Sequence, residues 1–152
     1  MANVKLGSHP SHGYTQVEKL DSDKQLTSHD SGKFFMIDQT AVFTINLPSL
    51  NSGAIAGWNC KFVIETVAAN AVYIMAYGLT SAGGATGDAE TVVFRQGGTT
   101  DDSSVAAAGS KDGVNFISGA VIMDEVNVFT DGTSWYISSV CEDAAHVIAI
   151  DA

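Results

Sequence analysis

The chain has 152 residues, of which 45% are hydrophobic, and carries a formal net charge of −10. This length and composition predict one folded domain rather than a disordered chain, and the acidic charge argues against a nucleic-acid partner, which requires clustered Lys and Arg. No apolar run approaches the roughly 20 residues of a membrane-spanning helix, and residues 1–13 lack the apolar stretch of a signal peptide. We therefore expect synthesis in a cytoplasm and no membrane partner.

Residues 1–23 show no sustained hydrophobic periodicity and contain Gly7, Pro10 and Gly13. We interpret them as an extended N-terminal arm that becomes ordered only against a partner, and residues 24–152 as the folded body. Through Lys33, four Lys balance four Asp and Glu, so the whole net negative charge comes from later residues. A neutral arm on an acidic body suggests that the two parts face different surroundings.

Short apolar or alternating segments recur through the body, separated by turns that contain Gly, Pro or Asn. Spacings of about 8 to 15 residues between such segments are typical of all-β proteins. No amphipathic helix longer than a turn or two is evident. We expect a single-domain β-sandwich or jelly-roll-like body, with a β-barrel as the related alternative. The expected strands are 33–38, 41–47, 58–67, 71–77, 91–94, 114–117, a segment at Ala120, the two halves of 124–140, and 146–150.

The clearest local signal is in residues 124–140 (DEVNVFTDGTSWYISSV). Val126 and Val128 alternate with polar residues before the Asp-Gly turn, and Trp135 and Ile137 alternate after it. Asp-Gly is a strong hairpin signal because both residues tolerate positive φ. We therefore predict a hairpin whose second strand places Trp135 and Tyr136 on opposite faces.

Two polar, glycine-rich segments, 78–90 and 95–113, are expected to be loops. Neither resembles a phosphate-binding loop, because no helix and no Lys-Ser/Thr pair follows the glycines. Loops of this length often bind ligands.

Metal binding has weak support in the sequence. His9 and His12 are three residues apart, but Pro10 and Gly13 disfavour the helix that would bring the two imidazoles together, and no further ligand is nearby. The acidic pairs at 101–102 and 142–143 lack the spacing of a calcium loop, so a loosely held Ca²⁺ is the minor alternative to solvated surface. We expect no metal and no cofactor.

Cysteine chemistry is also not indicated. We expect Cys60 and Cys141 to be buried free thiols. A disulfide between them is the alternative, because the sequence does not give the distance between their Cβ atoms. Cys141 precedes Glu142, Asp143 and His146, but a nucleophilic thiolate requires an electropositive setting and these acids oppose it. No set of catalytic residues can be assembled, so we expect a protein that is not an enzyme.

Aromatic residues are the remaining candidates for ligand contact. Trp58, Tyr73, Tyr77 and Tyr136 could stack on a sugar, whereas aromatic residues at alternate strand positions more often belong to a core or a subunit interface.

Three segments together resemble a motif set of tailed-phage virion proteins: residues 26–35 (LTSHDSGKFF), 42–48 (VFTINLP) and 128–136 (VFTDGTSWY). The set is found in head decoration (cement) proteins and in some fibre and tail proteins. Phe129-Thr130 replaces the more usual Ser before Asp-Gly. The resemblance covers about residues 26–136, and its motifs are structural, so it carries over no active-site residue.

This resemblance implies a β-sandwich decoration protein on the exterior of the virion capsid. Its partner would be the major capsid protein, and such proteins are typically homotrimers that clamp adjacent capsomers and stabilise the shell. The alternative is a carbohydrate- or receptor-binding module of a phage fibre or tail, which would use loops 78–90 and 95–113. On the decoration reading, the arm residues expected to contact the capsid are Val4, Lys5, Leu6, His9, His12 and Tyr14.

Overall fold

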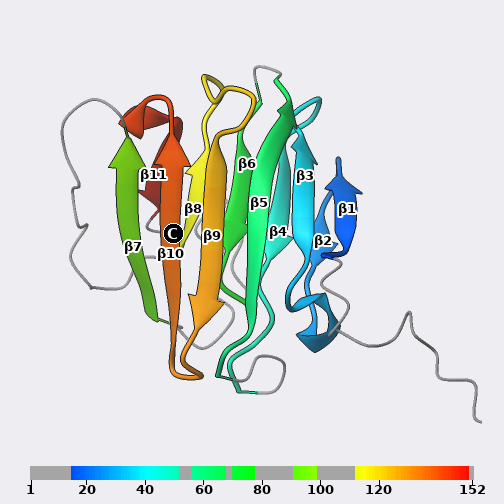
Figure 1. Cartoon of the computed structure of the whole chain (residues 1–152), viewed down its shortest axis with the longest axis vertical. Coiled ribbons are helices and arrows are strands. Elements are labelled where there is room, and N and C mark those ends of the chain that lie inside the picture. The colour runs from blue at the N-terminus through cyan, green and yellow to red at the C-terminus, as the bar shows by residue number, and fades with distance from the viewer. Residues whose placement is uncertain (1–14, 52–55, 68–69, 78–90, 99–111, 151–152) are drawn as a thin grey trace, which may run out of the picture.

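The computed structural model is an all-β sandwich of two facing sheets, which confirms the predicted fold class (Figure 1). It describes residues 15–51, 56–67, 70–77, 91–98 and 112–150. Two single-turn 3₁₀ helices, Ser28–Asp30 and Ala144–His146, are the described helical segments. The strands are β1 (Val17–Leu20), β2 (Lys24–Gln25), β3 (Phe34–Asp38), β4 (Phe43–Asn46), β5 (Asn59–Thr66), β6 (Val72–Met75), β7 (Thr91–Gly98), β8 (Gly113–Phe116), β9 (Glu125–Thr130), β10 (Ser134–Cys141) and β11 (Val147–Ile150).

The chain winds between the two sheets instead of completing one before the other. The six-stranded sheet has the order β1-β3-β5-β9-β10-β7, and the five-stranded sheet has the order β11-β8-β6-β4-β2. From β1 to β9, successive strands therefore alternate between sheets. Four of the resulting pairs within a sheet are parallel: β1 with β3, β2 with β4, β3 with β5, and β4 with β6. A jelly roll built only from antiparallel strands lacks such pairs.

The core lies between the sheets and follows from the alternation of the strands. In β3, Phe35 and Ile37 are fully buried, whereas Phe34 and Met36 face outward and are half-buried. The two tryptophans meet in the core with ring centroids 5.3 Å apart and planes at 84°, an edge-to-face contact. The indole of Trp58 also donates to the Thr27 carbonyl oxygen at 3.1 Å, so its polar atom is satisfied.

The predicted hairpin is confirmed. Strands β9 and β10 pair antiparallel, with Trp135 opposite Thr130 and Ile137 opposite Val128. Trp135 is buried and Tyr136 lies on the opposite face, as alternation requires. Gly132 has φ of +94°, a conformation that favours glycine, and the Asp131 carboxylate accepts hydrogen bonds from the backbone amides of Thr133 and Ser134.

The boundary of the expected N-terminal arm was wrong. Val17–Leu20 is not part of an arm but an edge strand of the six-stranded sheet, where Leu20 is buried against the core. Its partner is β3, with which it pairs in parallel, and the sequence of residues 1–23 alone does not reveal this partner. Residues 1–14 lie outside the described part of the chain.

Two further boundaries differ from expectation. Residues 95–98 belong to β7, which pairs with β10, so the second predicted loop does not begin at Arg95; loop residues 78–90 and 99–111 lie outside the described part. Ala120 is not in a strand, because residues 118–124 form turns. The last turn is closed by a hydrogen bond from the Asp124 amide to the Val121 carbonyl oxygen, and Met123 adopts φ of +76°, where a type II turn favours glycine.

Candidate interaction surface

The outer face of the six-stranded sheet presents two rows of side chains that cross β3, β5, β9 and β10. Register places Phe34 beside Lys61 and Lys61 beside Asn127 in one row. The adjacent row contains Asn59, Phe129 and Tyr136. Because these residues occupy the outward positions of regular strands, the sheet itself fixes their spacing.

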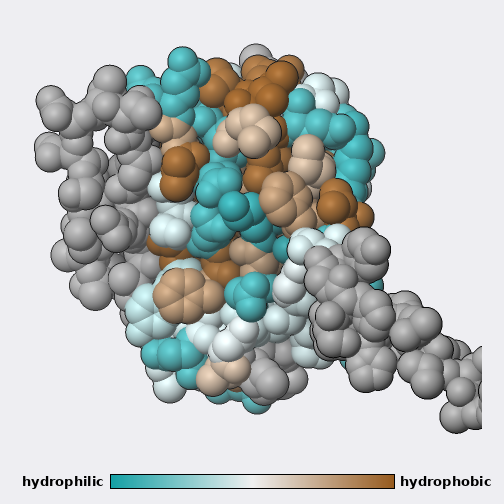
Figure 2. Space-filling model, viewed as in Figure 1, coloured by the Kyte–Doolittle hydropathy of each residue, from teal (hydrophilic) through white to brown (hydrophobic). Residues whose placement is uncertain are grey.

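An open groove of about 390 Å³ runs along this face, and we refer to it as the sheet groove. Apolar and polar patches lie next to one another on the same side of the molecule (Figure 2). Thr15, where the described chain begins, is at the groove. The lining residues are Thr15, Gly32, Lys33, Phe34, Asn59, Cys60, Lys61, Asn127, Val128 and Phe129.

An ordered aromatic pair borders the sheet groove. Phe129 is 50% exposed, and its ring stacks on Tyr136 with centroids 5.0 Å apart and planes at 11°. The Tyr136 hydroxyl donates to the Asp131 carboxylate at 2.9 Å. Hydrogen bonds from Thr133, Ser134 and Tyr136 lower the pKa of Asp131, and the same carboxylate raises the pKa of Tyr136. The turn of the hairpin therefore holds the aromatic pair in place.

Polar groups between β3 and β9 are also held by neighbours. The Lys61 ammonium forms a 2.9 Å ion pair with Glu125 and lies 6.0 Å from the centroid of the Phe34 ring. The Asn127 amide donates to Glu125 at 3.1 Å, and the Asn59 amide donates to the Gly57 carbonyl oxygen at 3.0 Å. The groove thus combines aromatic rings with fixed amide groups and a charge-compensated lysine.

The described lysines are on β1, β2 and β5 and just before β3, and each is paired with an acid. We refer to this part of the sandwich as the β1–β3–β5 side. Lys33 contacts Asp30 at 2.6 Å and Glu18 at 3.0 Å, and Lys24 also pairs with Glu18. Lys24 and Lys33 lower the pKa of Glu18. Burial raises the pKa of Asp30, but Lys33 and Thr27 outweigh it and the net shift is downward. These pairs give every described lysine at least one carboxylate partner, and the acids on this side outnumber the lysines.

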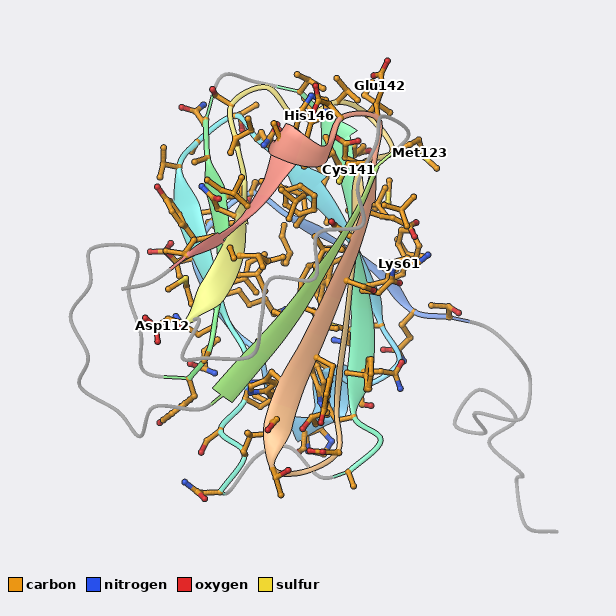
Figure 3. All side chains as sticks on the ribbon, turned by 90° about the vertical axis from the view of Figure 1, so that its left-hand side faces the viewer. Lys61, Asp112, Met123, Cys141, Glu142 and His146 are labelled. Atoms are coloured by element: carbon orange, nitrogen blue, oxygen red, sulfur yellow. The ribbon has the colours of Figure 1, made fainter. Side chains whose placement is uncertain are left out.

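A second cluster of polar residues lies at the end of the sandwich where Met123, Cys141, Glu142 and His146 are found (Figure 3). The His146 Nδ1 atom is 2.7 Å from the buried carboxylate of Asp124. That carboxylate also accepts hydrogen bonds from the backbone amides of Val121 and Glu142, both at 2.8 Å. These contacts indicate that the Asp124 carboxylate has a structural role, which is to fix the turn before β9.

Cys141 does not have the setting of a nucleophile. Burial and the neighbouring Asp124 charge raise its pKa to about 11, so the thiol is protonated near neutral pH. Burial also raises the pKa of Cys60. Both cysteines are free and buried, as the sequence predicted.

The described residues contain no group of three or more His, Cys, Asp and Glu side chains that could hold a metal ion. Glu142 and Asp143 are exposed, whereas His9, His12, Asp101 and Asp102 lie outside the described ranges. Among the described helices, none is long and apolar enough to cross a membrane.

The structure does not bring the predicted contact residues together in one site. The four aromatic residues considered for sugar stacking do not converge: Trp58 is in the core, Tyr73 is half-buried against it, Tyr77 is exposed beyond β6, and Tyr136 is at the candidate surface. The residues proposed for capsid contact all lie outside the described part of the chain: Val4, Lys5, Leu6, His9, His12 and Tyr14.

Sequence reasoning did not single out Phe34 and Phe129, which line the sheet groove. A signal for Phe129 was present, because Val126 and Val128 point inward and the next residue in the alternation must point outward. No comparable signal joined Phe34 to Phe129, since the two are brought together by pairing through β5.

Comparisons with known proteins add no relative: no family model, curated protein or solved structure matches this chain.

Proposed function

We propose that this chain is a non-enzymatic virion structural protein, a decoration or cement protein on the outer surface of a tailed-phage head. Its partner is the major capsid protein, and it stabilises the shell by clamping neighbouring capsomers as a homotrimer. Neither nucleic acid nor membrane is a partner in this proposal. The observation that carries it is that the three segments resembling phage virion proteins meet in one structural unit.

That unit is assembled around Trp58, the residue immediately before β5. Hydrogen bonds join the Gly57 amide to the Thr130 carbonyl oxygen at 2.9 Å and the Thr130 amide to the Trp58 carbonyl oxygen at 3.1 Å. The Trp58 indole donates to Thr27, and the Leu26 amide donates to Asn46 at 2.8 Å. Hydrogen bonds therefore connect the three segments, residues 26–35, 42–48 and 128–136. Such mutual support is expected of a motif that specifies a fold rather than a reaction.

The distribution of charge supports an orientation on the shell. The described lysines are held in ion pairs on the β1–β3–β5 side, whereas Glu142 and Asp143 are exposed acids that follow β10. We propose that the side with the ion-paired lysines faces the capsid and that the end with Glu142 and Asp143 faces solvent, where like charges keep particles apart. Residues 1–14 would extend the contact across the shell and add avidity.

Co-sedimentation with purified capsids tests the proposal. The full chain is expected to pellet with capsids, and a variant that lacks residues 1–14 is expected to remain in the supernatant. The truncation stops before β1, because removal of Val17–Leu20 would also damage the sheet. Equal occupancy of the two proteins would refute the role of residues 1–14, and no binding of the full chain would refute the decoration function.

A further inference from the structure

We propose that the sheet groove is a binding site for a neutral saccharide. Two aromatic rings line it from different strands: Phe34 on β3 and Phe129 on β9, with β5 between them. The C–H faces of a pyranose ring pack against aromatic rings, whose faces carry partial negative charge. A groove with an aromatic ring on each side of a strand suits a flat ligand that has two apolar faces.

The aromatic side of the groove is ordered before any ligand arrives. Phe129 is stacked on Tyr136, and Tyr136 is held in turn by its hydrogen bond to Asp131. Phe34 lies under the Lys61 ammonium. Because these side chains sit on paired strands, little conformational entropy is lost when a ligand binds.

The polar groups of the groove match vicinal hydroxyls. Asn127 and Asn59 each use an amide hydrogen within the chain, toward Glu125 and Gly57 respectively. In the described part of the chain, their side-chain carbonyl oxygens accept no hydrogen bond and remain available. Lys61 contributes donors from the adjacent row. A hydroxyl is both a donor and an acceptor, so neighbouring hydroxyls can use both kinds of group at once.

The charges of the groove favour a neutral ligand. Lys61 is paired with Glu125, and Lys33 is paired with Asp30 and Glu18, so neither lysine is uncompensated. An anionic ligand would have to compete with these carboxylates on a chain of net charge −10.

The volume indicates a small ligand. The groove of about 390 Å³ lies in the range of small-molecule sites, roughly 300 to 1,000 Å³. A stable protein partner would require about 800 Å² of buried surface on this side. We therefore infer that the occupant is one or two sugar units of a larger neutral glycan.

Backbone amide NMR on the full chain tests this inference. Glucose, galactose, mannose, N-acetylglucosamine and their β-linked disaccharides would be titrated to about 50 mM, a range that captures weak millimolar binding. At least one sugar is expected to give saturable shifts at Asn59, Lys61, Asn127 and Phe129. Phe129→Ala is expected to weaken that binding about tenfold, whereas Phe129→Tyr retains it. Tyr77→Ala, which removes an exposed aromatic residue elsewhere, is the matched control and should not change affinity.

Three outcomes would overturn the inference. The first is the absence of saturable shifts at the groove with every sugar in the panel. The second is equal affinity of Phe129→Ala and the unmodified chain. The third is a concentration-dependent shift of the same amides without sugar, abolished by Phe129→Ala, which would assign the groove to a second copy of the chain. Capsid co-sedimentation is measured separately, so a failed decoration function and a failed saccharide site can be distinguished.

Discussion

Asp124 shows how one side chain can determine the end of the sandwich. Its carboxylate is buried and receives the backbone amides of Val121 and Glu142 as well as a contact with His146. These partners come from the turn before β9, from the segment after β10 and from the second 3₁₀ helix. One aspartate thus ties the turn before β9 to the segment that follows β10.

We predict that Asp124→Ala lowers the free energy of unfolding by about 3 kcal/mol, because it leaves two backbone amides and an imidazole without their buried acceptor. Urea denaturation of the purified protein measures the change. Asp21→Ala is the control, since Asp21 is exposed and, among the residues that the structure describes, accepts a side-chain hydrogen bond from neighbouring Ser22 alone. A loss for Asp124→Ala as small as that of the control would show that the carboxylate is not structural.

Asp30 gives the fold a dependence on pH. Burial raises the pKa of its carboxyl, but the contacts with Lys33 and Thr27 lower this pKa by more than burial raises it. The folded pKa therefore lies below the ordinary value of 3.8. A group with a lowered folded pKa stabilises the chain above its unfolded pKa, and this stabilisation is lost as pH falls through the folded value.

We therefore expect Asp30→Asn to reduce stability by about 2 kcal/mol at pH 7. The difference from the unmodified chain should shrink as pH falls below about 4, because protonation of Asp30 removes the ion pair that Asp30→Asn already lacks. Unfolding free energies measured between pH 7 and pH 2 test this. A difference that stays constant across that range would mean that the pair with Lys33 contributes nothing through ionisation.

At the scale of elements, β8 depends on the absence of a side chain. A Cβ atom at Gly113 would lie 2.3 Å from the Ile74 carbonyl oxygen and 2.8 Å from the Met75 sulfur. Both neighbours belong to β6, the strand that pairs with β8. Close approach of the two backbones therefore requires glycine at this point.

Gly113→Ala is predicted to destabilise the protein by about 3 kcal/mol, because the clash involves backbone and cannot be relieved by a side-chain rotation. Gly119→Ala provides a matched control, since a Cβ atom there would meet its nearest neighbour at 3.6 Å, an ordinary contact. Thermal unfolding of the two variants compares them directly. Equal melting temperatures would contradict the argument from close approach.

The elements also show what the sequence could and could not reveal. The β9–β10 hairpin was predictable because its residues are contiguous: alternation gives the buried face and Asp-Gly gives the turn. The strand Val17–Leu20 was not, because its partner β3 follows only after the chain has crossed to the other sheet and back. Its short, charged sequence resembles an arm until that pairing is known.

The candidate surface was hidden for the same reason. Phe34, Lys61 and Asn127 form a row only through the parallel pairing of β3 with β5 and the antiparallel pairing of β5 with β9. Unequal spacing between these strands leaves no period that a sequence repeat search would detect.

At the scale of the whole molecule, the exposed apolar residues bear on assembly. Val17 and Val140 are exposed on the outer face of the six-stranded sheet, and Ile122 and Met123 are exposed at the turn before β9. Met123 holds this position at a positive φ, a conformation that costs free energy for a residue other than glycine. Apolar residues displayed in this way are typical of contact surfaces.

We predict that the purified protein is a homotrimer, with a mass near three times 15.8 kDa by light scattering on a sizing column. A glutamate at position 123 (Met123→Glu) is expected to lower that mass if the turn contributes to the contact, whereas Asp21→Ala should leave it unchanged. A monomeric mass for the unmodified chain at high concentration would contradict the prediction for the free protein.

The winding between sheets has a consequence for the order in which the protein can form. During synthesis, β3 can pair with β1 and β5 can then pair with β3, as each strand is made. Strand β7, in contrast, has no described partner until β10 has been made. Among the described strands, only β9 and β10 pair as neighbours in sequence, so every other pairing must first close a loop at a cost in entropy. Folding should therefore be slow, in the range of milliseconds to seconds typical of non-local β proteins, and should reach completion only after β10 has been synthesised.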